Sequence, residues 1–172
     1  MAGNSKRIYL IGFMGSGKTS LVKKLANKLG YEWRDIDADI ESATEMDIPT
    51  IFSEHGEDYF RKLEAQFLRT TGLEENMVVS CGGGTPCFEG NMLWMNENGI
   101  TIYLEMTPKA IYSRIKDQRE TRPLLQKIPE DKLLDHITEM LEQRLPFYEQ
   151  SQLTISGLTY KLPELVETIK SR

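Results

Sequence analysis

A glycine-rich segment at residues 12–19 constrains the fold of this chain more than any other feature of its sequence. The segment reads Gly-Phe-Met-Gly-Ser-Gly-Lys-Thr, which fits the pattern G-x-x-x-x-G-K-[ST]. A short apolar run of strand length, Arg7–Ile11, precedes it. After it, apolar residues recur at three- and four-residue steps until Gly30, as on one face of a helix. A strand, a tight turn and an amphipathic helix in this order predict a phosphate-binding loop, and that context disfavours a chance glycine-rich turn.

The residue types in this loop suit a nucleotide polyphosphate. Several main-chain N–H groups must converge on the phosphates, and a side chain at Gly12, Gly15 or Gly17 would obstruct them. The helix that follows directs its positive end to the same place. Lys18 can neutralise the β- and γ-phosphates, and the Thr19 hydroxyl can bind Mg²⁺. The predicted nucleotide-binding residues of the loop are Gly15, Ser16, Gly17, Lys18, Thr19 and Ser20.

The rest of the chain alternates between strand-like and helix-like segments. Further strand-like runs lie at residues 31–35, 77–80, 100–104 and 153–155. The helix-like segments lie at residues 49–55, 57–70, 108–116, 130–150 and 162–171. This alternation predicts an α/β fold of three layers, with a parallel sheet covered by helices on both faces. Because no linker-like stretch, internal repeat or low-complexity segment interrupts it, we expect residues 1–172 to form a single domain.

Composition excludes several classes of function. The chain has 172 residues, with 21 Lys and Arg against 26 Asp and Glu, and a net charge of −5. This balance disfavours a cationic surface for nucleic acid. No apolar run reaches the roughly 18–20 residues of a membrane span, and no secretory signal pattern is present. Two cysteines, Cys81 and Cys87, are too few for a disulfide framework, so we expect a reducing, cytoplasmic location and no membrane partner.

The class of nucleotide enzyme follows from what accompanies the loop. The base-reading motif of GTPases, N-K-x-D, is incomplete at residues 27–30, which read Asn-Lys-Leu-Gly. No aspartate follows the run at 77–80, where a Walker-B carboxylate is expected, so a metal-directed carboxylate must come from elsewhere. Asp35 and Asp37, after the second strand-like run, are the obvious source. These residues predict a small ATP-dependent P-loop kinase of the nucleoside-monophosphate-kinase type.

The sequence resembles the shikimate kinases from residue 7 to about residue 148. The motifs that carry the resemblance are Gly15-Ser16-Gly17-Lys18-Thr19, Asp35-Ile36-Asp37, Gly56-Glu57, Phe60-Arg61, Glu64, Gly82-Gly83-Gly84, Arg122-Pro123-Leu124-Leu125 and Arg144-Leu145-Pro146-Phe147-Tyr148. The resemblance implies a five-stranded sheet of order 2-3-1-4-5 and a monomer. It also implies phosphorylation of the shikimate 3-hydroxyl by ATP with Mg²⁺, giving 3-phosphoshikimate and ADP on the route to chorismate and the aromatic amino acids.

The same resemblance assigns the residues that bind shikimate. Arg61 and Arg144 match the positions that hold the carboxylate, for which a planar guanidinium is well suited. Asp37 matches the position that contacts the ring hydroxyls. Glu64 lies three residues after Arg61 on the same expected helix and can hold its guanidinium in place. The remaining expected contacts are Phe52 and Phe60, which wall the ring, and Gly82, Gly83 and Gly84, among which Gly83 is a main-chain donor.

Catalytic roles follow from the loose transition state of phosphoryl transfer. Lys18 and Arg122 are expected to neutralise the developing charge. Because the ordinary pKa of an aspartate is about 3.9, we interpret Asp37 first as a group that orients the hydroxyl, and as a proton acceptor only once bond formation acidifies it. Thr19 and Asp35 are expected to hold Mg²⁺, Asp35 directly or through water.

The segment at residues 118–129 resembles the family's lid, a loop that closes over both substrates and excludes water. Either Arg114 or Arg119 takes the family's adenine-stacking place, and we prefer Arg114. Without the resemblance, this polar segment reads as a solvated linker.

Simpler interpretations exist for other residues. Asp35 and Asp37 can cap the next helix, and Arg61 and Arg144 can form surface ion pairs. Another small-metabolite or nucleotide kinase, acting on gluconate or a nucleoside monophosphate, and a non-catalytic nucleotide-binding module are the rival functions. We expect the following to be core residues: Trp33, Trp94, Met92 and Met95.

Overall fold

The computed structural model describes residues 6–172, which are built around a five-stranded parallel sheet of order β2-β3-β1-β4-β5. The strands are β1 (Arg7–Ile11), β2 (Glu32–Asp35), β3 (Met77–Ser80), β4 (Ile100–Glu105) and β5 (Leu153–Ser156). Each strand runs parallel to its neighbours. The predicted strand order and parallel arrangement are therefore confirmed.

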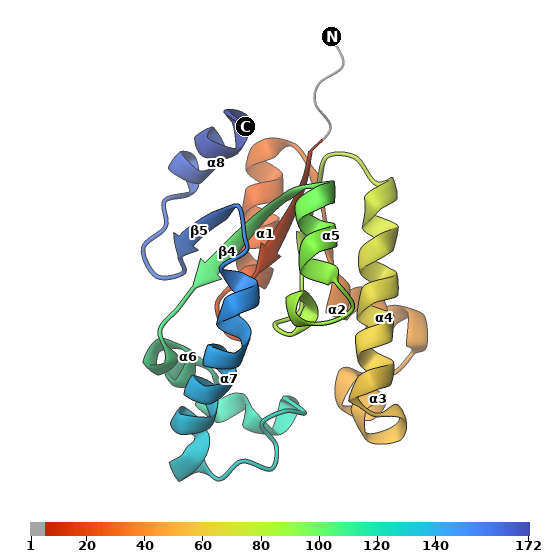
Figure 1. Ribbon diagram of the computed structural model, residues 1–172, viewed down its shortest axis with the longest axis vertical. Helices are drawn as coiled ribbons and strands as arrows, with labels where there is room; N and C mark the ends of the chain where they lie inside the picture. Colours follow the sequence, from red (N-terminus) through yellow and green to blue (C-terminus); the bar gives the residue numbers. More distant parts are fainter. Residues whose placement is uncertain (1–5) are drawn as a thin grey trace.

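Helices connect the strands and cover both faces of the sheet (Figure 1). The α-helices are α1 (Lys18–Leu29), α2 (Ile36–Thr44), α3 (Ile48–His55), α4 (Glu57–Thr70), α5 (Asn91–Asn98), α6 (Pro108–Ile115), α7 (Leu133–Tyr148) and α8 (Leu162–Lys170). Short 3₁₀ helices lie at η1 (Thr71–Leu73), η2 (Thr85–Cys87), η3 (Lys116–Thr121) and η4 (Glu130–Lys132). Among residues 6–172, no helix combines the length and the apolar character needed to cross a membrane.

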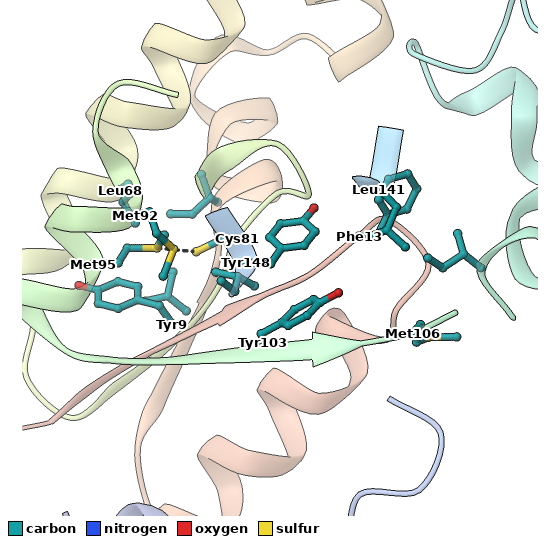
Figure 2. Packing of buried hydrophobic residues seen from close by; sticks show 14 of the residues in the cluster. Tyr9, Phe13, Leu68, Cys81, Met92, Met95, Tyr103, Met106, Leu141 and Tyr148 are labelled. Carbon is teal, nitrogen blue, oxygen red and sulfur yellow. Dashed lines mark hydrogen bonds between the residues drawn. The ribbon is translucent and has the colours of Figure 1, made fainter. Parts of the chain in front are cut away.

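Two apolar clusters hold the layers together, one on each face of the sheet. Ile8 and Leu10 of β1 pack with α1 and α8, whereas Tyr9 and Ile11 of the same strand pack on the opposite face. This follows from the two-residue period of a strand, which sends alternate side chains to opposite faces. Helices α4, α5 and α7 contribute to the cluster that contains Tyr9 and Ile11, and Figure 2 shows part of it.

The sequence-based expectations about the core were wrong at one position. Met92 and Met95 are buried and Trp94 is partly buried, as expected, but the side chain of Trp33 is 43% exposed. Trp33 lies on β2, which is an edge strand of the sheet, and the ammonium of Lys23 lies 4.9 Å from its ring centroid. The ring is therefore covered only in part, by a long cationic side chain from α1.

The carboxyl ends of three neighbouring strands meet at one edge of the sheet. In the strand register, Ser80 at the end of β3 pairs with Asp35 on one side and with Leu10 on the other. The glycine-rich loop follows β1, the two aspartates lie at the end of β2, and the glycine triplet follows β3. Because the strands are parallel, these three segments lie side by side, where ligands bind in open α/β sheets.

Candidate active site

The loop after β1 has the backbone expected of a phosphate cradle. Gly12 has a φ of 148°, and a Cβ at this position would lie 2.7 Å from the carbonyl oxygen of Leu104 on the neighbouring strand. Gly17, which precedes α1, has a φ of 99°. Only glycine adopts both conformations without strain, so the local sequence dictates a turn that exposes main-chain N–H groups in front of the helix N-terminus.

Lys18 is buried beneath this loop. Its ammonium donates to the carbonyl oxygens of Gly12 at 2.7 Å and Phe13 at 2.9 Å, which holds the side chain back along the loop. Burial lowers the pKa of Lys18 to about 8, and the nearby carboxylate of Asp37 is the largest influence in the opposite direction. The side chain is therefore still mostly charged at pH 7.

Asp35 has two roles, one for each carboxylate oxygen. Oδ1 accepts from the N–H groups of Asp37 and Ala38, so Asp35 is the N-cap of α2. Oδ2 accepts from the hydroxyl of Thr19 at 3.3 Å. The capping interpretation was thus right for Asp35, but the cap leaves one oxygen beside the Thr19 hydroxyl. A carboxylate oxygen and a hydroxyl oxygen are hard ligands of the kind that Mg²⁺ prefers, so Asp35 and Thr19 fit a site for that ion.

Two adjoining cavities lie along the strand ends. The first, the loop cavity, has a volume of about 470 Å³ and is lined by residues that include Gly15, Lys18 and Thr19. The second, the arginine cavity, has a volume of about 200 Å³ and includes Arg61 and Arg144 in its lining. Five residues line both cavities and mark their junction: Met14, Asp37, Gly82, Gly83 and Arg122.

Arg61 is held on several sides within the arginine cavity. Its Nη1 lies 2.7 Å from Glu64 Oε2, and its Nη2 lies 3.0 Å from Glu57 Oε1. The centroid of the Phe88 ring lies 4.5 Å from the centre of the guanidinium. A Cβ on Gly84 would come within 2.5 Å of Arg61 Nη1, so glycine at this position makes room for the guanidinium. Burial lowers the pKa of Arg61, but Glu64 and Glu57 outweigh that effect and raise it.

Arg144 on α7 differs from Arg61 in its surroundings. Its Nη1 is buried and has no hydrogen-bond partner among residues 6–172. Its guanidinium lies 5.3 Å from the centroid of the Phe13 ring, and a Cβ on Gly83 would lie 3.1 Å from Nη1. The interpretation as a surface ion pair is wrong for both arginines, because both side chains are buried and line the cavity.

Asp37 lies at the junction with a buried Oδ1 that has no partner in the described part of the chain. Burial is the main cause that raises its pKa to about 7, followed by the negative charges of Glu64 and Asp35. Lys18 and Arg61 lower the pKa by less. The assumption of an ordinary aspartate pKa was therefore wrong, because it ignored burial and two neighbouring carboxylates. Asp37 has the proton affinity of a general base at neutral pH.

The segment expected to be a lid, residues 118–129, begins within η3, which follows α6. Arg122 lines both cavities, and its Nη2 donates to Gln118 Oε1 at 2.8 Å. Arg114 donates to the Gly15 carbonyl at 3.1 Å and lines the loop cavity. Arg119 instead donates to the Ile128 carbonyl, which joins two parts of the segment, and lines neither cavity. The geometry therefore favours Arg114 at the nucleotide.

The other predicted residues divide between the two cavities. Phe52, Phe60, Glu64 and Gly84 line the arginine cavity, with the two phenylalanine ring centroids 4.9 Å apart. Ser16 is buried beneath the loop and close to the Lys18 ammonium. Ser20 is exposed and lines neither cavity.

Sequence reasoning missed several residues that support the site. Glu57 is the second carboxylate on Arg61, and its spacing of four residues on one helix could have indicated the contact. Gln118 contacts Arg122 at the same spacing, but in a 3₁₀ segment that the sequence did not predict. Phe88 lies far from Arg61 in the sequence, and no local pattern indicates that it stacks there.

Comparisons with known proteins identify the family of this chain. The family model described as shikimate kinase matches residues 14–172. A shikimate kinase from Bacteroides fragilis is 45% identical over 145 residues, which cover 84% of this chain and 81% of the relative. The crystal structure of a shikimate kinase from Bacteroides thetaiotaomicron has 38% sequence identity and a TM-score of 0.83, covering 97% of this chain and 95% of the other. A structure from Acinetobacter baumannii, described as a shikimate kinase in complex with shikimate, has 32% identity and a TM-score of 0.86, with 96% and 91% coverage. The chain belongs to the shikimate kinase family and is a phosphotransferase with an alcohol acceptor.

Proposed function

We propose that this chain transfers the γ-phosphoryl group of ATP to the 3-hydroxyl of shikimate, with Mg²⁺, and releases 3-phosphoshikimate and ADP. The observation that carries the proposal is the junction of the two cavities at Asp37, Gly83 and Arg122. One cavity has the groups for a polyphosphate and the other has the groups for a small carboxylic acid. A hydroxyl at the junction is within reach of a phosphoryl group bound in the loop.

ATP binds with its phosphates in the loop cavity. The main-chain N–H groups of residues 15–20 and the Lys18 ammonium hold the β- and γ-phosphates, and Arg114 stacks on the adenine. Thr19 and Asp35 hold Mg²⁺, which when bound supplies positive charge to the phosphate oxygens. The hydrogen bond between Thr19 and Asp35 supports this pairing, because it places two oxygen ligands together at the loop.

Shikimate binds in the arginine cavity. The free Nη1 of Arg144 and the fixed guanidinium of Arg61 hold its carboxylate. Phe52 and Phe60 pack against the ring, and the Asp37 carboxylate accepts from the hydroxyl that reacts. This orientation directs one hydroxyl towards the loop cavity, which converts a bimolecular encounter into a reaction between held groups.

The chemical step then forms one bond and breaks another. The hydroxyl oxygen attacks the γ-phosphorus while the bond from that phosphorus to the β,γ-bridging oxygen breaks, and ADP leaves. The hydroxyl proton passes to Asp37, whose pKa of about 7 suits a proton acceptor better than that of an ordinary aspartate. Lys18 and Arg122 neutralise the charge that develops on the transferred group.

The remaining parts of the proposal concern the enzyme as a whole. Residues 6–172 form a single domain, and the enzyme acts as a monomer. Residues 118–129 close over the substrates and exclude water. The two free cysteines support a reducing cytoplasm, where the product enters the route to chorismate and the aromatic amino acids.

A coupled assay of ADP release tests the proposal with shikimate, gluconate and a nucleoside monophosphate as acceptors. We expect rapid turnover with shikimate alone, and its loss in Lys18→Met. Turnover with gluconate or the nucleotide but not with shikimate contradicts the proposal, and no turnover with any acceptor supports a non-catalytic module. Arg61→Ala should raise the KM for shikimate and leave that for ATP nearly unchanged, whereas an equal loss of ATP affinity contradicts the role of Arg61.

A further inference from the structure

Tyr148, at the end of α7, contacts the active site from behind the glycine triplet. Its side chain is fully buried, and its hydroxyl donates a hydrogen bond of 2.5 Å to the Gly83 carbonyl oxygen. The residue lies four positions after Arg144, so both side chains project from one face of the same helix. One helix therefore contacts the turn with a tyrosine hydroxyl and presents a guanidinium to the arginine cavity.

Gly83 lies between the Arg144 guanidinium and the main chain of the glycine-rich loop. It lines both cavities, and a Cβ at this position would lie 3.1 Å from Arg144 Nη1 and 3.2 Å from the main-chain nitrogen of Met14. Within residues 6–172, the N–H groups of Gly82, Gly83 and Gly84 donate to no protein acceptor. They are donors that a ligand in the adjoining cavities can use.

A run of three glycines does not fix its own orientation, because each residue adopts many backbone conformations. The peptide group between Gly83 and Gly84 is planar, so its N–H points away from its C=O. When Tyr148 holds that carbonyl, the N–H of Gly84 must face the opposite side of the peptide. The carbonyl oxygens of Gly82 and Gly84 accept from the main-chain N–H groups of Thr85 and Cys87. The hydrogen bond from Tyr148 fixes the remaining carbonyl of the turn, that of Gly83.

We propose that Tyr148 is a positioning residue for the acceptor, which fixes the glycine turn relative to Arg144 through its hydrogen bond to Gly83. This inference rests on the proposed function, because it concerns how shikimate is held. Tyr148 remains a donor at all working pH values, since burial raises the pKa of its hydroxyl. Tyr148 lines neither cavity, so its loss acts on the acceptor through Gly83 and through the adjacent Arg144 guanidinium, which also interacts with its hydroxyl.

Tyr103 provides a matched control. Its ring packs against that of Tyr148 with centroids 4.9 Å apart, and it is also buried (Figure 2). Its hydroxyl makes no hydrogen bond to any residue of the described chain. Tyr103→Phe therefore removes a hydroxyl from the same aromatic pair without releasing the glycine turn.

Steady-state kinetics of Tyr148→Phe test the inference. Loss of one hydrogen bond is expected to raise the KM for shikimate by about five- to tenfold. The KM for ATP should change less than twofold, since the loop after β1 is untouched, and Tyr103→Phe should resemble the wild type in both. As a rescue, p-aminophenylalanine at position 148 keeps a donor and should restore the wild-type KM, whereas p-fluorophenylalanine fills the same space without a donor and should not.

Several results would overturn the inference. An unchanged KM for shikimate in Tyr148→Phe, an equal rise in the KM for ATP, or the same rise in Tyr103→Phe shows that the hydroxyl does not position the acceptor. Equal KM values for the amino and fluoro variants lead to the same conclusion, even where Tyr148→Phe folds poorly. Failure of the proposed function is recognised separately, because the wild-type protein then shows no turnover with shikimate.

Discussion

Replacing Glu64 by glutamine tests whether the buried carboxylate of Asp37 must lose its proton before phosphoryl transfer. In the wild type, kcat/KM for shikimate should rise with pH through about 7, where Asp37 ionises. It should fall only above about 8, because the bound phosphates raise the pKa of Lys18 beyond its value in the free protein. On the acid limb, kcat/KM rises because Asp37 must lose its proton to act as a base. On the alkaline limb, it falls because Lys18 must keep its proton to act as a cation. Because Asp37 and Lys18 interact, the two limbs report apparent values for the pair.

The size of the effect follows from the distance between the two carboxylates. A Cβ on Gly82 would lie 2.6 Å from Glu64 Oε1 and 3.1 Å from Asp37 Oδ1, so the two oxygens lie within about 6 Å of each other, where a like charge raises a pKa. At about 6 Å and an effective dielectric constant of about 20, two unit charges repel by about 3 kcal/mol, or about two pH units. Solvent in the cavity screens part of this repulsion. We therefore expect Glu64→Gln to shift the acid limb of the profile to a pH about one unit lower.

The assay is ADP release at saturating ATP between pH 5.5 and 9, fitted for the position of each limb. Glu64→Gln also frees Arg61, which raises the KM for shikimate, but that change scales the profile without displacing it. Glu57→Gln is the control, because Glu57 contacts the same guanidinium and is not among the groups that set the pKa of Asp37. An acid limb that stays in place in Glu64→Gln, or moves equally in Glu57→Gln, refutes the reasoning.

Three further predictions concern single positions. Asp37→Asn should raise the free energy of unfolding by about 1–3 kcal/mol at pH 8 and change it little at pH 4. The reason is that the raised pKa of Asp37 means that folding disfavours its ionised form. Urea unfolding at both pH values checks this, and an equal effect at both contradicts it. Arg114→Ala should raise the KM for ATP about tenfold and Arg119→Ala less than twofold, and the reverse order in initial-rate measurements refutes the assignment. Gly84→Ala should raise the KM for shikimate about tenfold without changing that for ATP, since its Cβ displaces the Arg61 guanidinium; a wild-type KM shows that the cavity tolerates the methyl group.

The parts of the fold that the sequence predicted are those encoded by local patterns. The strand, turn and helix around residues 7–29 follow from an apolar run, three glycines and a helical period, and all are present. The alternation of strands and helices was sufficient to predict a parallel sheet. Helix α5 was not assigned, because its sequence, Asn-Met-Leu-Trp-Met-Asn-Glu-Asn, lacks a clear polar face and Leu93 within it is exposed.

Properties that depend on neighbours distant in the sequence could not be predicted. Trp33 was expected in the core because of its residue type, but its exposure depends on the position of β2 at the sheet edge. The pKa of Asp37 depends on burial and on Glu64, which is 27 positions away on another helix. The sequence therefore predicted residues that line the two cavities, such as Asp37, Arg61 and Arg144, but not the electrostatic environment around them.

That environment separates two arginines that have the same predicted role. Arg61 is already paired with Glu57 and Glu64, so it offers an incoming carboxylate well-aligned N–H groups but little uncompensated charge. Arg144 has a buried Nη1 without a protein partner and offers both charge and a free donor. Glu64 in turn fixes Arg61 and raises the pKa of Asp37. In the proposed reaction, one buried glutamate thus links the position of the acceptor to the basicity of the group that takes its proton, because the same charge acts on both neighbours.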